Sequence, residues 1–392
     1  MAMRPKDRPG IFNIFFVFLG LGLSSFGGPW AHLAYFRTEF VARRRWLTEH
    51  AYAELVALCQ LLPGPTSSQV GMGIGLDQGG FGGMLAAWLG FTLPSALLMV
   101  LFGLVLTTNH FDQQSAWLHG LKLAAVAVVA HAVLGMARSL DGERTRVSIA
   151  AAAALGCLLA PGALAQLGVI LASGIAGAFL VRDPGTAPQA GVAEGRGHAG
   201  AALSLGLFLA LLLFSLISHD PWLECFSAYY RSGALVFGGG HVVLPLLHDQ
   251  VVARGWVDPA TFLAGYGAAQ ALPGPLFSFA AFLGEVSQQA PNGWTGAAFA
   301  LAAIYLPSAL LLLGVLPLWS RLRGQAGMRK ALAGVNAGVV GLLLAALYSP
   351  LGMGAVLNGR DFGTTTAAFV ALEFWGAPPL LIVALAAGAA SI

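Results

Sequence analysis

Two short motifs in the first half of the sequence combine residue types that suit the binding of an anion. In one of them, proline and glycine interrupt an apolar segment and are flanked by hydroxyl and amide side chains. Its residues are Gln60, Pro63, Gly64, Pro65, Thr66, Ser67, Ser68 and Gln69. Proline favours the first helical turn and Thr or Ser the helix start, so we expect one helix to end here and another to begin. A helix start carries about half a positive charge and free N–H groups, which together suit an oxyanion.

The other motif uses the same device nearer to the N-terminus. Gly27 and Gly28 precede Pro29, which is expected to open a helix that carries His32, a further candidate donor to an anion. Inside a membrane, the N–H groups freed by such breaks must be satisfied by protein, water or a ligand. Two alternatives stay open. The breaks could be plain kinks filled by neighbouring helices, and Gln60 could join helices instead of contacting a ligand.

Both motifs recur later in the chain, in the same order and at an almost constant spacing. Phe-Gly-Gly at 26–28 returns at 237–239, and Gln-Leu-Leu-Pro-Gly-Pro at 60–65 returns as Gln-Ala-Leu-Pro-Gly-Pro at 270–275. Trp-Leu at 46–47 and Leu-Pro-Ser-Ala-Leu-Leu at 93–98 have matching copies too. We therefore predict two related halves. The candidate binding residues of the second half are Gly238, Gly239, Gly240, His241, Gln270, Pro273, Gly274 and Pro275.

The basic residues predict that the two halves are inverted. The loop before Trp46 is basic, and the loop after the segment 81–106 contains no lysine or arginine. The second half reverses this, because Arg254 stands alone before Trp256 and a basic cluster follows the segment 295–319. The two clusters are Arg37, Arg43, Arg44 and Arg45, and Arg321, Arg323, Arg329 and Lys330. Since lysine and arginine are retained on the cytoplasmic side, equivalent loops face opposite sides, with the N-terminus cytoplasmic and the C-terminus periplasmic.

Composition decides the class of protein. Of the 392 residues, 57% are hydrophobic and 9% are charged, whereas a soluble domain carries about 25% charged residues. The 20 basic and 17 acidic residues leave a net charge of only +3 without a basic face, which argues against nucleic-acid binding. Cys59, Cys157 and Cys225 are far apart and form no metal or disulfide pattern. No HExxH, GxSxG or Walker motif is present, so we expect no enzyme, no cofactor and no metal.

The apolar segments predict an all-α polytopic membrane protein of two inverted repeats with Gly/Pro-broken half-helices. Such repeats are the architecture of secondary transporters, whose site lies at the repeat interface near the midplane. We expect spanning helices over 81–106, 117–138, 200–217, 295–319 and 331–348, and hairpins over 147–181 and 362–391. Shorter interrupted segments are 11–28, 51–62, 66–76, 223–239, 261–272 and 276–286. The predicted organisation is a first repeat over 1–181, a flexible linker over 182–200, an extra helix over 201–218 and a second repeat over 219–392.

A few charged residues inside or beside these segments could serve transport. Glu54 is a candidate proton carrier, or else a partner of the nearby arginines. Lys122 lies on an anion path or extends its ammonium to the interface, and its counterpart in the second half is Asn336. Arg37 is a further candidate for the anion path, while the run 43–45 is first a topology anchor.

At these residues the sequence resembles the chromate ion transporter family in its long two-domain bacterial form. The motifs that carry the resemblance are SSFGGPWAHLAYFRTEFV from Ser24, the RRRWL that follows, CQLLPGPTSSQVG from Cys59, and, in the second half, GALVFGGGHVVLPLL and AAQALPGPLFSFAAFLG. The resemblance implies a carrier of the bacterial inner membrane that exports chromate and so confers resistance. The second half has Gly240 in place of Pro29 and Leu-Phe in place of Thr66-Ser67, so we expect the first half to dominate binding.

The expected function is export of a tetrahedral dianion, driven by the membrane potential, by ion coupling or by both. Moving a dianion out of a negative-inside cell releases about 4.6 kcal/mol per 100 mV, enough for about three decades of concentration ratio. The expected partners are chromate, its near-isostere sulfate, the lipid bilayer and, as an option, a second copy of the chain. The alternatives are a sulfate or other anion importer or exchanger of the same fold and a membrane scaffold that transports nothing.

Overall fold

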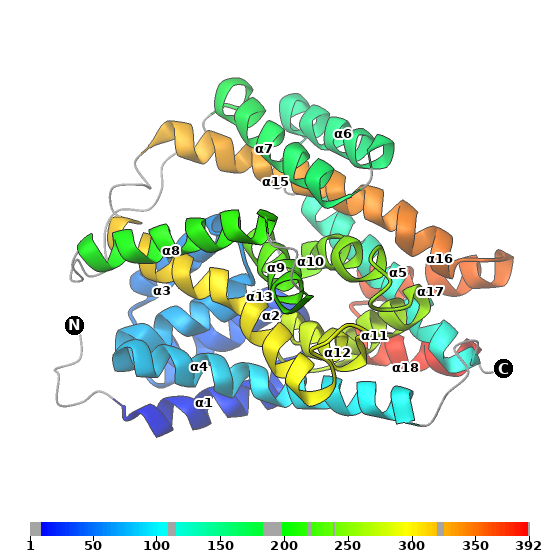
Figure 1. The fold of residues 1–392 in the computed structure, drawn as a ribbon, viewed down its shortest axis with the longest axis horizontal. Coiled ribbons are helices and arrows are strands. Elements are labelled where there is room, and N and C mark those ends of the chain that lie inside the picture. Colours follow the sequence, from blue (N-terminus) through cyan, green and yellow to red (C-terminus); the bar gives the residue numbers. More distant parts are fainter. Residues whose placement is uncertain are drawn as a thin grey trace.

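The computed structural model describes residues 9–108, 115–138, 140, 142–160, 162–182, 198–217, 221–237, 240–319 and 325–390, and every regular element in these ranges is a helix (Figure 1). This confirms the predicted all-α membrane architecture. The first half contains α1 (Ile11–Ser24), α2 (Gly28–Phe36), a π-helical segment (Arg37–Arg43), α3 (Glu49–Leu61), α4 (Thr66–Thr108), α5 (Ala116–Arg138), α6 (Arg144–Leu159) and α7 (Ala163–Leu180).

The remaining helices follow the predicted linker, most of which lies outside the described residues. They are α8 (His198–Ile217), α9 (Pro221–Ala234), α10 (Val243–Leu247), α11 (Pro259–Ala271), α12 (Phe279–Val286), α13 (Gly293–Val315), α15 (Ala326–Ala346), α16 (Met353–Ala355), α17 (Gly359–Phe374) and α18 (Pro379–Ala390). Short 3-10 segments at Gly240–Val242, Leu276–Ser278 and Leu316–Leu318 and π-helical segments at His248–Val252 and Leu347–Gly352 connect some of them.

Four helical stretches of the described chain are long and apolar enough to cross a membrane, namely Thr66–Thr108, Ala116–Arg138, Gly293–Leu318 and Ala326–Ala355. They contain four of the five predicted spanning segments. The fifth, in α8, is among the shorter apolar helices. The segments 66–76 and 81–106 are separate helices, as expected, although α4 labels them as one element. The backbone of Gly79 and Gly80 between them is not helical, and Gly75 and Gly83 approach each other closely across this break.

The helices pack in two groups that α5 connects (Figure 1). α1 lies along α4, and α6 and α7 lie along α15. α5 contacts α11, α17 and α18. A hydrogen bond and an ion pair fix α5 to α17: His119 Nε2 is 2.9 Å from Asp361 Oδ1, and Arg138 Nη1 is 2.5 Å from Glu373 Oε1. Glu373 also accepts a contact from His131 Nδ1 at 2.8 Å.

Buried aromatic rings pack around α2 in the first half. Phe36 lies between Phe18 and Phe91, with ring centroids 5.7 and 5.0 Å apart, and the His32 ring stands edge-on to Phe91 at 5.3 Å. Edge-to-face packing of this kind fixes ring orientation beyond the burial of apolar area. The orientation of the His32 imidazole is therefore set by α1 and α4 as well as by its own helix.

Each of the two Pro-Gly-Pro turns donates a backbone hydrogen bond to the opposite half of the chain. The Gly64 N–H donates to the Val236 carbonyl at 2.6 Å, and the Gly274 N–H donates to the Ser25 carbonyl at 2.9 Å. Each acceptor directly precedes a Phe-Gly-Gly motif. The duplicated motifs are thus neighbours in space. The inverted orientation of the halves stays a prediction.

Candidate functional site

The start of α4 lies in the protein interior, as the first motif predicts. α3 ends at Leu61, and the first backbone hydrogen bond of α4 runs from Gln69 N to Pro65 O at 2.9 Å. The N–H groups of Thr66, Ser67 and Ser68 precede that bond and so have no acceptor within the helix. The side chains of Ser67 and Ser68 are buried. The positive end of this helix is therefore held away from bulk water.

The start of α2 lies next to it. Gly27 and Gly28 have φ angles of 98° and 78°, a left-handed geometry that favours glycine, and Pro29 occupies the first turn. The buried His32 ring joins the two helix starts, with Nδ1 3.2 Å from Ser67 Oγ and Nε2 3.2 Å from the Ser25 carbonyl. Because a carbonyl only accepts, Nε2 carries the proton, and Nδ1 of the neutral ring accepts from Ser67.

The Pro-Gly-Pro turn that leads into α4 fits closely against the second half. Gly64 has a φ of 126°, and a Cβ at this position would collide with Ser308 Oγ and lie 2.7 Å from Gln69 Nε2. The turn is also fixed from within, because Gln69 Nε2 donates to the Pro63 carbonyl at 2.7 Å. Only glycine combines this backbone geometry with this contact.

Three polar atoms without a hydrogen-bond partner belong to residues that contact this turn or His32. Ser25 Oγ, Gln69 Oε1 and Ser308 Oγ are buried and have no hydrogen-bond partner among the described residues. Nearby, Ser68 Oγ lies 3.4 Å from the hydroxyl of Tyr305 on α13. Buried polar groups are normally paired, because an unpaired one loses its water without compensation. The free hydroxyls of Ser25 and Ser308 can donate hydrogen bonds to an oxyanion.

Sequence reasoning missed the contributions of Ser25, Tyr305 and Ser308. The repeated Leu-Pro-Ser motif contains Ser308 and is the only signal that could have found it. Its counterpart Ser95 faces the other turn, where a Cβ at Gly274 would lie 2.9 Å from Ser95 Oγ. Unlike Ser308, Ser95 already donates, to the Thr92 carbonyl at 3.0 Å.

Other predicted site residues lie apart from this cluster or in different geometry. The Gln60 side chain is exposed on α3, and Gln270 is half-buried on α11. Gly238 and Gly239 lie outside the described residues. His241 Nδ1 contacts the Tyr266 hydroxyl at 2.9 Å.

The breaks of the second half do not lead directly into α-helices. Gly240 begins a single 3-10 turn, and Pro273, Gly274 and Pro275 are likewise followed by the 3-10 segment Leu276–Ser278 before α12 starts. The sequence predicted four α-helix starts at these breaks. Only the two breaks of the first half lead directly into α-helices, and the two breaks of the second half lead into 3-10 turns.

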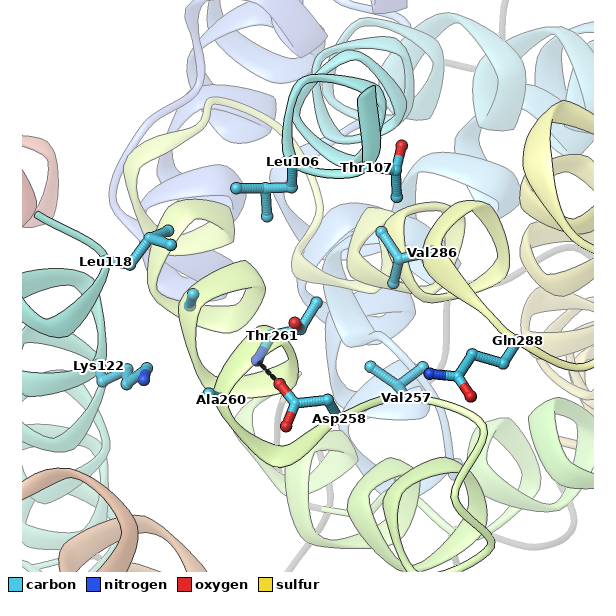
Figure 2. Close-up of a pocket in the computed structure, with 11 residues that line it drawn as sticks. Leu106, Thr107, Leu118, Lys122, Val257, Asp258, Ala260, Thr261, Val286 and Gln288 are labelled. Atoms are coloured by element: carbon cyan, nitrogen blue, oxygen red, sulfur yellow. Dashed lines mark hydrogen bonds between the residues drawn. The ribbon is translucent and has the colours of Figure 1, made fainter. Parts of the chain in front are cut away.

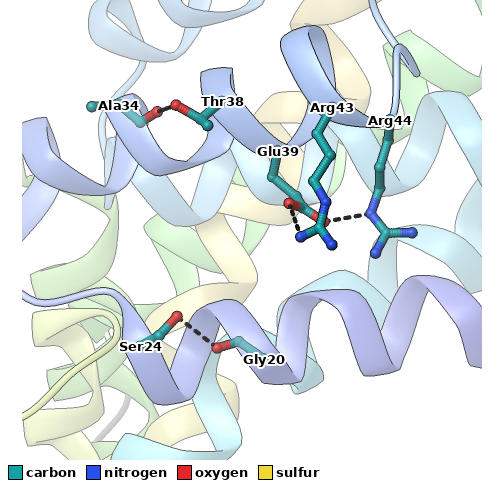
Figure 3. A network of polar contacts seen from close by, with 7 residues as sticks. All are labelled: Gly20, Ser24, Ala34, Thr38, Glu39, Arg43 and Arg44. Atoms are coloured by element: carbon teal, nitrogen blue, oxygen red, sulfur yellow. Dashed lines mark hydrogen bonds and ion pairs between the residues drawn. The ribbon is translucent and has the colours of Figure 1, made fainter.

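Three of the basic residues before Trp46 are paired at the protein surface. Arg37 Nε donates to Glu49 Oε1 at 2.6 Å, both side chains are exposed, and Glu49 raises the pKa of the Arg37 guanidinium. Figure 3 shows Glu39 between two arginines: its carboxylate lies 3.2 Å from Arg43 Nη1 and 2.5 Å from Arg44 Nε. These arginines thus pair with carboxylates other than the buried Glu54.

Two cavities lie outside the helix breaks. One, of about 440 Å³, is lined by Lys122 and Asp258 among others (Figure 2). The other, of about 260 Å³, contains the hydrogen bond from Gln166 Nε2 to Asp249 Oδ2 at 2.7 Å. Neither is lined by the Pro-Gly-Pro residues. Within the described ranges, no group of three His, Cys, Asp or Glu side chains could hold a metal ion.

Comparison with known proteins identifies the family. The family model described as chromate transporter matches residues 12–178 and residues 223–392, which together cover most of the chain. The chain belongs to the chromate transporter family. The two matched regions correspond to the two halves that carry the repeated motifs, and the predicted linker falls between them.

Relatives of this chromate transporter family member are named transporters. It is 29% identical to the chromate transport protein of Pseudomonas aeruginosa over 84% of this chain and 79% of that one. It is 30% identical to the probable chromate transport protein of Synechococcus elongatus over 75% and 72% of the two chains. An uncharacterized transporter of Methanocaldococcus jannaschii is 27% identical over 88% and 85%. No solved structure matches the chain significantly.

Proposed function

We propose that this protein is a secondary transporter that exports chromate across the bacterial inner membrane, with the anion held at the starts of α2 and α4. Family membership and the relatives named chromate transport proteins support chromate as the substrate. The observation that carries the proposed site is the buried contact between His32 and Ser67, which brings two helix starts together. Two positive helix ends can replace part of the water that a doubly negative solute loses in the membrane.

The side chains around these helix starts suit a tetrahedral oxyanion. The amides of Ser67 and Ser68 and the hydroxyls of Ser25 and Ser308 offer donors in several directions. His32 holds Ser67 in place through the contact between its Nδ1 and Ser67 Oγ. Release then requires only that the second half withdraw from the turn at Gly64.

Transport needs a driving force, and the membrane potential provides one for export. A dianion that leaves a negative-inside cell gains about 4.6 kcal/mol per 100 mV. The buried carboxyl of Glu54 on α3 is the candidate for additional proton coupling. The proposed orientation has a cytoplasmic N-terminus and a periplasmic C-terminus, following the basic cluster that ends at Arg45.

Counterflow in proteoliposomes tests the proposal. Vesicles that contain the purified protein are loaded with chromate, sulfate or molybdate and diluted into labelled chromate. We expect the protein to exchange chromate. Imposed membrane potentials of opposite sign should drive net chromate movement in opposite directions. Preferential sulfate exchange would support the sulfate carrier of the same fold instead, and absence of exchange of all three anions would support a scaffold.

A further inference from the structure

The larger cavity is lined by Lys122, the lysine of α5. This cavity lies between the end of α4, α5, the start of α11 and the end of α12 (Figure 2). Its polar lining comes from Lys122, Asp258, Thr107, Thr261 and Gln288. Because one water occupies about 30 Å³, a volume of about 440 Å³ can hold a tetrahedral oxyanion together with several waters.

Lys122 lacks a protein counter-ion at contact distance. Its side chain is only 9% exposed, and Figure 2 shows its nitrogen directed toward the cavity. No carboxylate of the described residues lies within ion-pair distance of this ammonium, and Asp258 is the acidic residue that lines the same cavity. A buried cation in a membrane helix is costly unless an anion compensates it. A bound anion would supply the missing partner.

Asp258 has a structural task that does not need its charge. Its Oδ2 accepts from the Thr261 N–H at 2.8 Å and so caps the start of α11. At the equivalent start of α3, the uncharged Thr48 does the same with the Ala51 N–H at 3.2 Å. A hydroxyl could therefore cap the start of α11, and the negative charge of Asp258 is not needed for this capping.

The repeat counterparts of Lys122 and Asp258 carry no charge. Lys122 corresponds to the neutral Asn336, and Asp258 corresponds to the neutral Thr48. A purely structural ion pair would bring the two charges into contact, whereas these two line a cavity from different helices without touching. The arrangement instead suits a transient ligand that one group attracts and the other repels.

We propose that the cavity around Lys122 is an oxyanion vestibule, separate from the helix breaks, in which Lys122 binds the anion and Asp258 weakens its retention. This inference rests on the proposed transport of a tetrahedral dianion. Repulsion by Asp258 keeps the anion from staying on Lys122, so the vestibule passes its ligand on. The positive-inside prediction places the vestibule at the periplasmic side, because the loop between α4 and α5 contains no lysine or arginine.

Charge-removing variants test the vestibule. Lys122→Met should raise the KM for chromate in proteoliposomes by about tenfold, the loss expected for one hydrogen bond to a charged group. Lys122→Arg keeps the charge and should stay close to the wild type. Asp258→Thr copies the cap of α3 and should lower the KM by about two- to fivefold, as expected for removal of one solvated charge contact. In the Lys122→Met background, Asp258→Thr should have no effect on KM.

A binding measurement separates this inference from the proposed function. Molybdate should raise the thermal midpoint of the detergent-solubilised protein, and the half-saturating molybdate concentration should rise about tenfold in Lys122→Met. Lys330→Met on α15 is the matched control and should leave KM and midpoint shift unchanged. Size-exclusion profiles identify variants that do not fold, and in that case Asp258→Thr alone decides.

The outcomes are distinct. If the wild type exchanges chromate and neither KM nor the molybdate shift changes in Lys122→Met or Asp258→Thr, the vestibule is refuted. If the wild type exchanges no anion but the molybdate shift depends on Lys122, the vestibule stands and the proposed transport fails.

Discussion

Replacement of Gly64 by alanine tests the close fit between the first Pro-Gly-Pro turn and the second half. Gly64 has a φ of 126°, where a side chain costs about 1–2 kcal/mol. The added Cβ would also collide with Ser308 Oγ and lie 2.7 Å from Gln69 Nε2, and overpacking of a buried site costs about 1–3 kcal/mol. We therefore expect Gly64→Ala to destabilise the protein by about 2–5 kcal/mol.

Thermal unfolding in detergent and chromate exchange in proteoliposomes measure the effect. Gly28→Ala is the first control: φ is 78° but no atom lies within 4 Å of the added Cβ, so only the backbone strain of about 1–2 kcal/mol applies. Gly135→Ala on α5 is the second, because its Cβ also meets nothing within 4 Å and a helical alanine is favoured by about 0.5–1 kcal/mol. If Gly64→Ala unfolds no earlier than Gly28→Ala, the argument about Ser308 is wrong.

Three further substitutions probe the site and its supports. Ser67→Ala leaves His32 Nδ1 without its donor and removes the contact that joins the two helix starts; exchange should fall with a stability loss of about 1–3 kcal/mol, and an unchanged KM for chromate would count against the site. Glu373→Gln removes the carboxylate between His131 and α5's terminal arginine, so the thermal midpoint should fall, and an unchanged midpoint would show that the pairs contribute nothing. Asp258→Ala should cost about 1 kcal/mol more than Asp258→Asn, which still caps α11; equal midpoints would contradict this.

The helix breaks could be predicted from the sequence because proline and glycine act locally. Pro29 lacks an N–H and so belongs in a first helical turn, and the Pro-Gly-Pro motif at 63–65 separates α3 from α4 for the same reason. The long apolar runs likewise predict most of the spanning helices. The break between the segments 66–76 and 81–106 was predicted as well, and it lies at Gly79 and Gly80, whose backbone is not helical.

The partners of these breaks could not be predicted, because they come from tertiary contacts. Ser308 is far from Gly64 in the sequence, and nothing in its Leu-Pro-Ser motif indicates that it meets the opposite turn. The same holds for Tyr305 and Ser68. Lys122 was recognised as an unusual charge, but the cavity it faces depends on how α4, α11 and α12 end around it.

Direct localisation of the ligand tests the central claim. A cryo-EM map of the wild-type protein in lipid nanodiscs with molybdate should show a compact density within hydrogen-bond distance of the Ser67 amide, next to Gly64 and Ser308. Density confined to other regions of the protein, with the starts of α2 and α4 filled by protein side chains alone, would contradict the account.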